Sequence, residues 1–221
     1  MPAKNQDLHG NVPERAEAAL LLIDTINDME FPGGEVLFPH AMEAAKNIAA
    51  LKQRCRAAGL PALYVNDNFG RWQSDIAKLV THVIDDGTRG RPIAELLKPD
   101  ADQDYFVLKP KHSGFFSTTL DILLQYLGAR TLILTGFTAD ICVLFTANDA
   151  YMRDFNLLIP SDCVASLEPS ENTHALQHMQ RVLKADIRPS SGIDIKRFSS
   201  DKSVDREPRE ALPSQRGFRG R

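Results

Sequence analysis

The stretch of residues 131–151 constrains the fold of this chain more than any other part of the sequence. It opens with a short apolar run that is bounded by Gly136, a pattern typical of a buried strand. From Ile141 onward it continues as an apolar run that is too long for a strand and is typical of a mostly buried helix. A strand, a tight turn and a helix in succession form part of a βαβ unit, which predicts a parallel sheet.

Cys142 lies at the first turn of this predicted helix, directly after the end of the strand. Unpaired backbone N–H groups and the positive end of the helix dipole favour a thiolate at such a position. The same N–H groups are suited to holding an oxyanion. The alternative is a core cysteine in an ordinary βα unit, and this stretch alone leaves both interpretations open.

The rest of the chain alternates in the same way. Apolar runs predict strands at 18–24, 61–66, 104–109 and 155–160 and a short last strand at 186–188, and periodic patterns predict helices at 40–58, 73–84, 118–127 and 170–184. Residues 85–100 hold several glycines and prolines and are expected to be irregular, with one short helix at most. This alternation predicts an α/β fold whose parallel sheet is covered by helices on both faces.

Composition and charge narrow the class of protein. A length of 221 residues suits one α/β domain, which we place at 18–198, after a flexible lead-in at 1–17 and before a disordered tail at 199–221. A net charge of −3 gives no indication of a nucleic-acid partner, and no apolar run reaches membrane-spanning length. The three cysteines show no CxxC spacing, which favours a cytoplasmic protein with free thiols.

Three chemically active side chains are expected at one edge of the sheet. The first predicted strand ends at Asp24, the third ends at Lys109, and the fourth leads into Cys142. The carboxyl ends of parallel strands meet at one edge, where α/β folds place their sites. Asp24 would accept the thiol proton and Lys109 would stabilise the thiolate. The alternatives are a strand-end carboxylate that caps a loop and a solvated surface lysine, although Pro110 favours a fixed turn.

Three sequence motifs occur in order along the chain. The first is LLIDTINDMEF around Asp24, the second is KPKHSGF from Lys109 to Phe115, and the third is TGFTADICVLFTANDA around Cys142. With these motifs the chain resembles the isochorismatase-like cysteine hydrolases, the superfamily that includes nicotinamidases. The resemblance covers roughly residues 18–190.

The resemblance implies a catalytic triad of Cys142, Asp24 and Lys109. It implies a cis peptide bond between Phe137 and Thr138, and an oxyanion hole formed by the backbone N–H groups of Thr138 and Cys142. It also implies a three-layer α/β/α fold with a six-stranded parallel sheet in the order 3-2-1-4-5-6, and a homo-oligomer.

The chain departs from the nicotinamidases at the place of their metal motif. Those enzymes carry Asp-x-His after the second strand and a further histidine downstream, whereas residues 66–72 here read NDNFGRW. Asp67 alone does not form a site, and His82 alone is expected to be a satisfied helix histidine. We therefore expect no catalytic metal and no cofactor, and nicotinamide becomes a less favoured substrate.

The function hypothesis is hydrolysis of an amide-type C–N bond in a small molecule through a thioester on Cys142. Asp24 would take the thiol proton, protonate the leaving amine and activate the water that hydrolyses the thioester. Asn66, Trp72 and Phe115 are candidates for lining the substrate pocket, although the two aromatic residues are equally suited to the core or an interface.

Three other functions stay open at this stage. The first is an isochorismatase-type hydrolase of a small carboxylic-acid metabolite, although isochorismatases proper generally have glycine at the place of Cys142. The second is a thiol redox protein in which Cys163 resolves an oxidised Cys142. The third is a non-catalytic oligomeric binding module on the same fold, which the intact triad disfavours.

Overall fold

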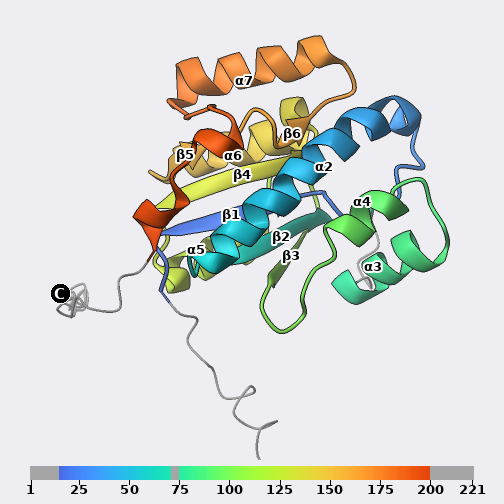
Figure 1. The fold of residues 1–221 in the computed structure, drawn as a ribbon, viewed down its shortest axis with the longest axis horizontal. Helices are drawn as coiled ribbons and strands as arrows, with labels where there is room; N and C mark the ends of the chain where they lie inside the picture. The colour runs from blue at the N-terminus through green and yellow to red at the C-terminus, as the bar shows by residue number, and fades with distance from the viewer. Residues whose placement is uncertain (1–14, 71–74, 200–221) are drawn as a thin grey trace, which may run out of the picture.

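The structure is a computed structural model that describes residues 15–70 and 75–199. The predicted lead-in and tail lie almost wholly outside the described residues. Within the described part of the chain the sheet has six strands, all paired in parallel. They are β1 (Ala18–Ile23), β2 (Ala62–Asp67), β3 (Tyr105–Lys109), β4 (Thr131–Phe137), β5 (Asn156–Leu158) and β6 (Val164–Ala165). Figure 1 shows this sheet at the centre of the molecule.

The strand order is β3-β2-β1-β4-β5, which confirms the predicted order for the first five strands. The sixth strand differs in its place, because β6 pairs with the end of β4 and not with β5. Asp186, where the last strand was predicted, makes only a single bridge to Leu158 at the outer side of β5. The reason is that β5 ends at Leu158, before Pro160, and the chain then returns to β4 further along it, where Val164 pairs with Gly136.

Helices cover both faces of the sheet, as the alternation predicted. On one face α2 (Gly34–Ala57), α3 (Ile76–Asp85) and α4 (Arg91–Leu96) share one apolar core with the sheet. On the other face α5 (Leu120–Leu127), α6 (Leu144–Tyr151) and α7 (Pro169–Leu183) share a second core with it. All six residues of β1 and all seven of β4 are buried, as expected for strands in the middle layer. The three-layer α/β/α class is therefore confirmed (Figure 1).

Two helices begin elsewhere than predicted. Helix α2 begins at Gly34 and carries Pro39 inside it, so a segment that looks like a loop in sequence is helical. After β4, residues Ala139–Val143 form a π-helical turn, and the regular helix α6 begins only at Leu144. The carbonyl of Thr138 accepts hydrogen bonds from both Ile141 N–H and Val143 N–H, which gives this turn its wide geometry. Cys142 thus lies in a π-helical turn and not in the first turn of an α-helix.

Among the helices of the described residues, none is long and apolar enough to cross a membrane.

Candidate active site

Asp24 stands directly after β1 and has a left-handed backbone conformation, with φ of 51°. Its side chain is buried and is held from two sides. Oδ1 accepts a hydrogen bond from the backbone N–H of Asp67 at 2.6 Å, and Oδ2 lies 2.8 Å from Nζ of Lys109. A non-glycine residue in this backbone region is uncommon and points to a functional constraint.

Lys109 is the last residue of β3, and its side chain is fully buried. Because β2 lies between β3 and β1, the lysine stem must pass the end of β2 to reach Asp24. Its Nζ lies 3.5 Å from Asp67 Oδ2 and 3.5 Å from Sγ of Cys142. The structure therefore brings together the three side chains that the sequence placed at this edge, with Lys109 touching the other two.

The half-buried Cys142 lies in the π-helical turn that follows β4. The peptide bond between Phe137 and Thr138, at the start of this turn, is cis. Two side-chain hydrogen bonds hold the turn in place: Ser166 Oγ donates to Asp140 Oδ1 at 2.5 Å, and Thr146 Oγ1 donates to the carbonyl of Cys142 at 2.7 Å. The nucleophile candidate is thus fixed by hydrogen bonds from the residue that follows β6 and from α6.

The electrostatics of the cluster keep the thiol protonated at rest. Burial, and after it the Asp24 carboxylate, raise the pKa of the Cys142 thiol well above its ordinary value. Burial also raises the pKa of Asp24, although Lys109 and the hydrogen bonds from the thiol and from Asp67 N–H oppose this. Burial lowers the pKa of Lys109, but the attraction of Asp24 and Cys142 outweighs it and the net shift is upward. The stable resting thiolate expected from the helix terminus is therefore not what the structure favours.

Asp67 belongs to this cluster, although the sequence showed it only as an incomplete metal motif. Its backbone N–H binds Asp24 and its carboxylate faces Lys109, while Phe69 N–H donates to its Oδ1 at 2.6 Å. The register pairs Asp67 with Lys109 at the ends of β2 and β3. This pairing is a consequence of sheet order, which no local sequence signal carries.

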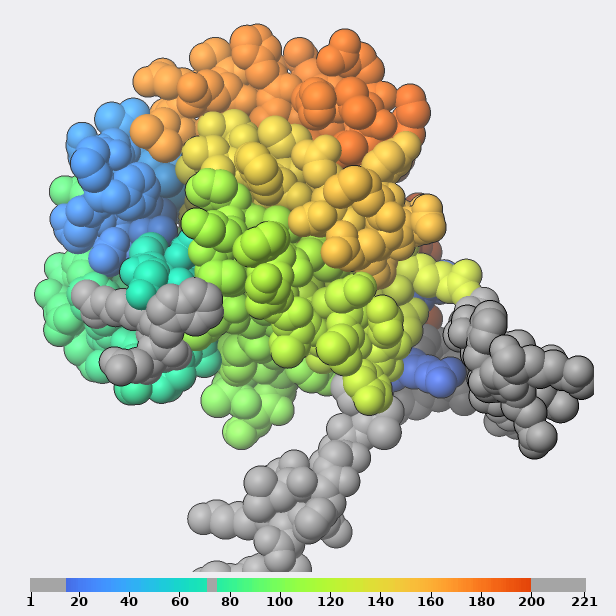
Figure 2. Space-filling view, turned by 180° about the vertical axis from the view of Figure 1, so that it is seen from behind, coloured from blue at the N-terminus to red at the C-terminus, as the bar shows by residue number. Residues whose placement is uncertain are grey.

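His112 is a second residue that the sequence reasoning missed. Its Nδ1 lies 3.9 Å from Sγ of Cys142, and its ring is tilted against that of Phe145 with centroids 5.5 Å apart. Within the motif that begins at Lys109 it was visible as a histidine three positions further on. Figure 2 shows the loop that carries it, in green, against the yellow residues of the turn and of α6.

Two of the three predicted pocket residues, Asn66 and Phe115, are buried away from the surface of the site. Asn66 is fully buried, and its Nδ2 donates to the carbonyl of Ile26 at 2.7 Å, so it holds the loop after Asp24 and offers no surface to a substrate. Phe115 is buried in the core against Phe155, with ring centroids 6.1 Å apart. Trp72 lies outside the described residues.

Among residues 15–70 and 75–199 no group of three or more histidine, cysteine, aspartate or glutamate side chains is placed to hold a metal ion. His82 is paired with carboxylates, since Nδ1 lies 2.7 Å from Asp86 Oδ2 and Nε2 lies 3.3 Å from Asp28 Oδ2. It is a satisfied helix histidine, and it ties α3 to the loop that follows Asp24.

This pairing predicts a pH-dependent contribution to stability. Hydrogen bonds to Asp86 and then to Asp28 raise the pKa of His82 above its ordinary value. The stabilisation is therefore complete below the unfolded-state pKa of about 6.5 and is lost as pH rises through the higher folded-state pKa. Because the side chain is 38% exposed, we expect only about 0.5 kcal/mol. Urea unfolding should show wild type more stable than His82→Gln by this amount at about pH 5.5, whereas an equal difference at pH 9 would contradict the ion pairs.

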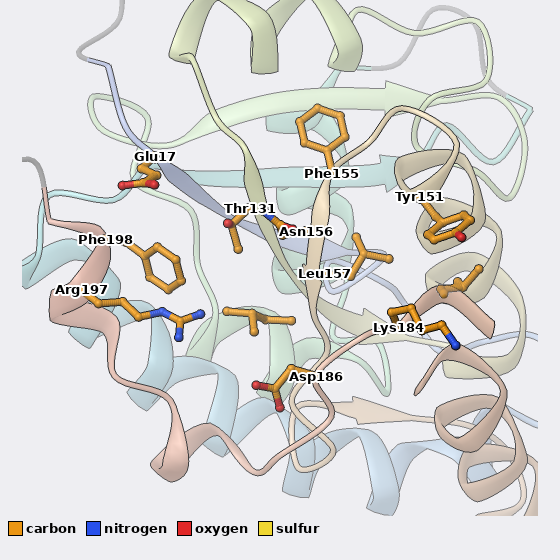
Figure 3. A pocket seen from close by; sticks show the side chains of 12 residues that line it. Glu17, Thr131, Tyr151, Phe155, Asn156, Leu157, Lys184, Asp186, Arg197 and Phe198 are labelled. Atoms are coloured by element: carbon orange, nitrogen blue, oxygen red, sulfur yellow. The ribbon is translucent and has the colours of Figure 1, made fainter. Parts of the chain in front are cut away.

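One hollow of the surface lies elsewhere. It has a volume of about 590 Å³ and is lined by residues such as Thr131, Asn156, Arg197 and Phe198 (Figure 3). Thr131 and Asn156 begin β4 and β5, so the hollow opens at the amino ends of the strands. The cluster around Cys142 lies at the carboxyl ends. The hollow is thus at the opposite edge of the sheet from the residues that carry chemistry.

A parallel three-layer fold with a cysteine, an aspartate and a lysine at the carboxyl edge agrees with what the resemblance to the isochorismatase-like cysteine hydrolases implied. The comparison with family models gives the same result, because residues 18–186 match the isochorismatase domain. The chain belongs to the isochorismatase family. An uncharacterized isochorismatase family protein of Bacillus subtilis (strain 168), YaaI, is 43% identical to it over 173 residues, which are 78% of this chain and 94% of that protein.

Solved structures of amidases share the fold. N-carbamoylsarcosine amidase from Thermoplasma acidophilum matches with a TM-score of 0.62 and 28% identity over 80% of this chain and 99% of that one. The pyrazinamidase/nicotinamidase from Streptococcus mutans UA159 matches with a TM-score of 0.60 and 31% identity over 77% of this chain and 99% of that one. The family and these neighbours support a hydrolase.

Proposed function

We propose that this chain is a cysteine hydrolase that cleaves a C–N bond of a small amide through a thioester on Cys142. One observation carries the proposal: the buried Lys109 ammonium lies 2.8 Å from Asp24 Oδ2 and 3.5 Å from Sγ of Cys142, which places the carboxylate and the thiol against the same cation. A nucleophile within reach of a base that a third group orients is the arrangement of covalent catalysis.

The pKa directions explain how the thiol is activated. The thiol is protonated at rest, and the Asp24 carboxyl has a raised pKa, which makes it a stronger base than an exposed carboxylate. When Asp24 takes the thiol proton, its negative charge disappears while the charge of Lys109 stays. The new thiolate is then paired with the Lys109 ammonium, which no longer faces a charged Asp24, so proton transfer and thiolate stabilisation occur together.

The reaction then follows from the site. The thiolate attacks the amide carbonyl, and the backbone N–H groups of Thr138 and Cys142 stabilise the oxyanion. The C–N bond breaks as a general acid of the site gives the nitrogen a proton, and the nitrogen leaves as ammonia or a small amine. Water then attacks the thioester and gives a proton back to that group, and the C–S bond breaks as Asp24 returns the thiol proton to Sγ. Relatedness to an N-carbamoylsarcosine amidase and a nicotinamidase supports C–N bonds as the substrate class.

Ammonia release over a panel of small primary amides, ureido compounds and nicotinamide tests the proposal. We expect wild type to release ammonia from at least one of them and Cys142→Ala to lose the activity by about 10³-fold or more, since the nucleophile is absent. His174→Gln, a change at an exposed residue of α7, is the matched control and is expected to keep full activity. Release that persists in Cys142→Ala would overturn the thiol mechanism.

The redox alternative finds less support in the structure. Cys163 is fully buried and packs with Cys55 in the core on the α2 face of the sheet. Cys142 packs against the core on the opposite face. A resolving thiol must reach the oxidised sulfur, and these two cysteines are on different sides of the sheet.

A further inference from the structure

We infer that His112 is a second proton-transfer residue of this site, which activates the hydrolytic water and protonates the leaving nitrogen while Asp24 exchanges its proton only with Cys142. The inference rests on the thiol mechanism proposed above and divides its proton transfers between two groups. It starts from the position of His112 Nδ1, 3.9 Å from Sγ of Cys142.

The side chains around the Cys142 sulfur differ in their exposure to solvent. Asp24 and Lys109 are buried, with side chains 8% and 0% exposed, whereas His112 is exposed. Water and departing amine exchange with solvent, so they occupy the accessible side of a thioester on Cys142. His112 is the titratable side chain on the described residues that contacts the sulfur from that side.

Both carboxylate oxygens of Asp24 already have partners and are poorly placed to bind the hydrolytic water as well. Its Oδ1 already accepts from Asp67 N–H, and its Oδ2 is bound to Lys109 and faces the thiol. A general base must lie within hydrogen-bond reach of the proton that it takes. A water that reached Asp24 would have to displace one of these partners, whereas a water between the thioester and His112 would not.

His112 is also held in place well enough for catalysis. The loop that carries it is pinned to α6 by two hydrogen bonds, from Ser113 Oγ to Asp149 Oδ2 and from Gly114 N–H to Thr146 Oγ1 at 3.0 Å. Thr146 in turn binds the carbonyl of Cys142. The ring of Phe145, one turn after the nucleophile, supports the imidazole. The distance between imidazole and sulfur is therefore set by the same helix that positions Cys142.

The proton count closes over one cycle. During acylation Asp24 takes the thiol proton, the S–C bond forms, the C–N bond breaks, and the His112 imidazolium gives a proton to the leaving nitrogen. During deacylation the neutral imidazole takes a proton from water, the hydroxyl oxygen bonds to the carbonyl carbon, the C–S bond breaks, and Asp24 returns its proton to Sγ. The sum is amide plus water giving acid plus amine, with both residues restored.

The test uses 4-nitrophenyl acetate, because 4-nitrophenolate leaves without needing a proton. Acylation of Cys142 should then proceed without His112, and only hydrolysis of the acetyl-enzyme should need it. For His112→Gln we expect release of one equivalent of 4-nitrophenolate at the wild-type rate, followed by turnover that is about 100-fold slower than in wild type. Intact mass should show accumulated acetyl-enzyme. His174→Gln is the matched control and should behave as wild type.

Each other outcome overturns the inference. Unchanged acylation and turnover in His112→Gln would make the imidazole a bystander. A parallel loss of both would show that it only maintains the shape of the site. In both cases Cys142-dependent acylation of wild type would leave the thiol mechanism standing. If 4-nitrophenolate release from wild type does not depend on Cys142, the proposed function fails, and the role of His112 fails with it.

Discussion

Replacing Lys109 with methionine is expected to destabilise the protein by about 3–5 kcal/mol and to abolish its activity. The Lys109 side chain is fully buried and its ammonium lies 2.8 Å from Asp24 Oδ2. Without Lys109 the Asp24 carboxylate stays buried but no longer has a positive charge beside it to compensate the cost of burying a negative charge. Activity is lost because the buried ammonium that stabilises the Cys142 thiolate, after the proton has moved to Asp24, is absent.

The stability deficit should depend on pH. Burial already raises the pKa of Asp24, and Lys109 holds that rise back, so the pKa rises further in the variant. A carboxyl whose folded-state pKa exceeds its unfolded-state value binds protons more tightly in the folded state, and stability therefore falls as pH increases. We expect the deficit of Lys109→Met, measured by urea unfolding, to be largest at neutral pH and to become smaller as the pH is lowered and Asp24 takes up a proton.

Two variants control this prediction. Asp24→Asn combined with Lys109→Met removes both charges and should be more stable than Lys109→Met alone. Lys52→Met breaks another buried ion pair, in which Nζ lies 2.6 Å from Oδ2 of Asp104, the residue before β3 and thus at the opposite end of that strand from Lys109. It should lose stability but keep the activity of its folded molecules. A Lys109→Met variant as stable as wild type would show that the pair with Asp24 contributes nothing to folding.

Much of this site was predictable because a parallel sheet brings strand ends together. Asp24, Lys109 and Cys142 each follow a recognisable apolar strand, so a count of strands was enough to place them at one edge. The roles of Asp67 and His112 were not predictable in the same way. Asp67 joins the cluster through its register with Lys109 on β3, and His112 through the folding of an irregular loop onto α6.

The errors in the fold have a related cause. Local patterns assign the run after β4 to a helix from Ile141, but the hydrogen bonds of Thr138 widen the first turn into a π-helix. They also place the last strand at Asp186, whereas pairing with β4 selects Val164–Ala165. In the second place a contact between segments far apart in the sequence overrides the local preference, whereas in the first the hydrogen bonds are local. The π-helical turn carries Cys142, so the turn that the local pattern predicts wrongly is also the one that holds the candidate nucleophile.

Gly136→Ala is expected to destabilise the protein by about 4 kcal/mol or more, because two costs add at one residue. Gly136 has φ of +113°, a conformation that alanine adopts only with strain of about 1–2 kcal/mol. A Cβ there would also lie 2.0 Å from the carbonyl oxygen of Ile23, which pairs with Gly136 in the register of β1 and β4. That oxygen belongs to the middle of the sheet and has no room to move without shifting β1.

The close contact between residue 136 and the carbonyl oxygen of Ile23 links stability to function. Ile23 immediately precedes Asp24, and Gly136 immediately precedes the Phe137–Thr138 peptide that leads to Cys142. Any shift of β1 away from β4 therefore separates the base from the thiol, and the folded fraction of Gly136→Ala should also acylate slowly with 4-nitrophenyl acetate.

Gly59→Ala is the matched control: φ is +75° but a Cβ there meets nothing within 4 Å, so only the strain of about 1–2 kcal/mol is expected, with activity unchanged. Equal losses of stability in the two variants would mean that the backbone conformation, and not the close approach of β1 and β4, accounts for glycine at position 136.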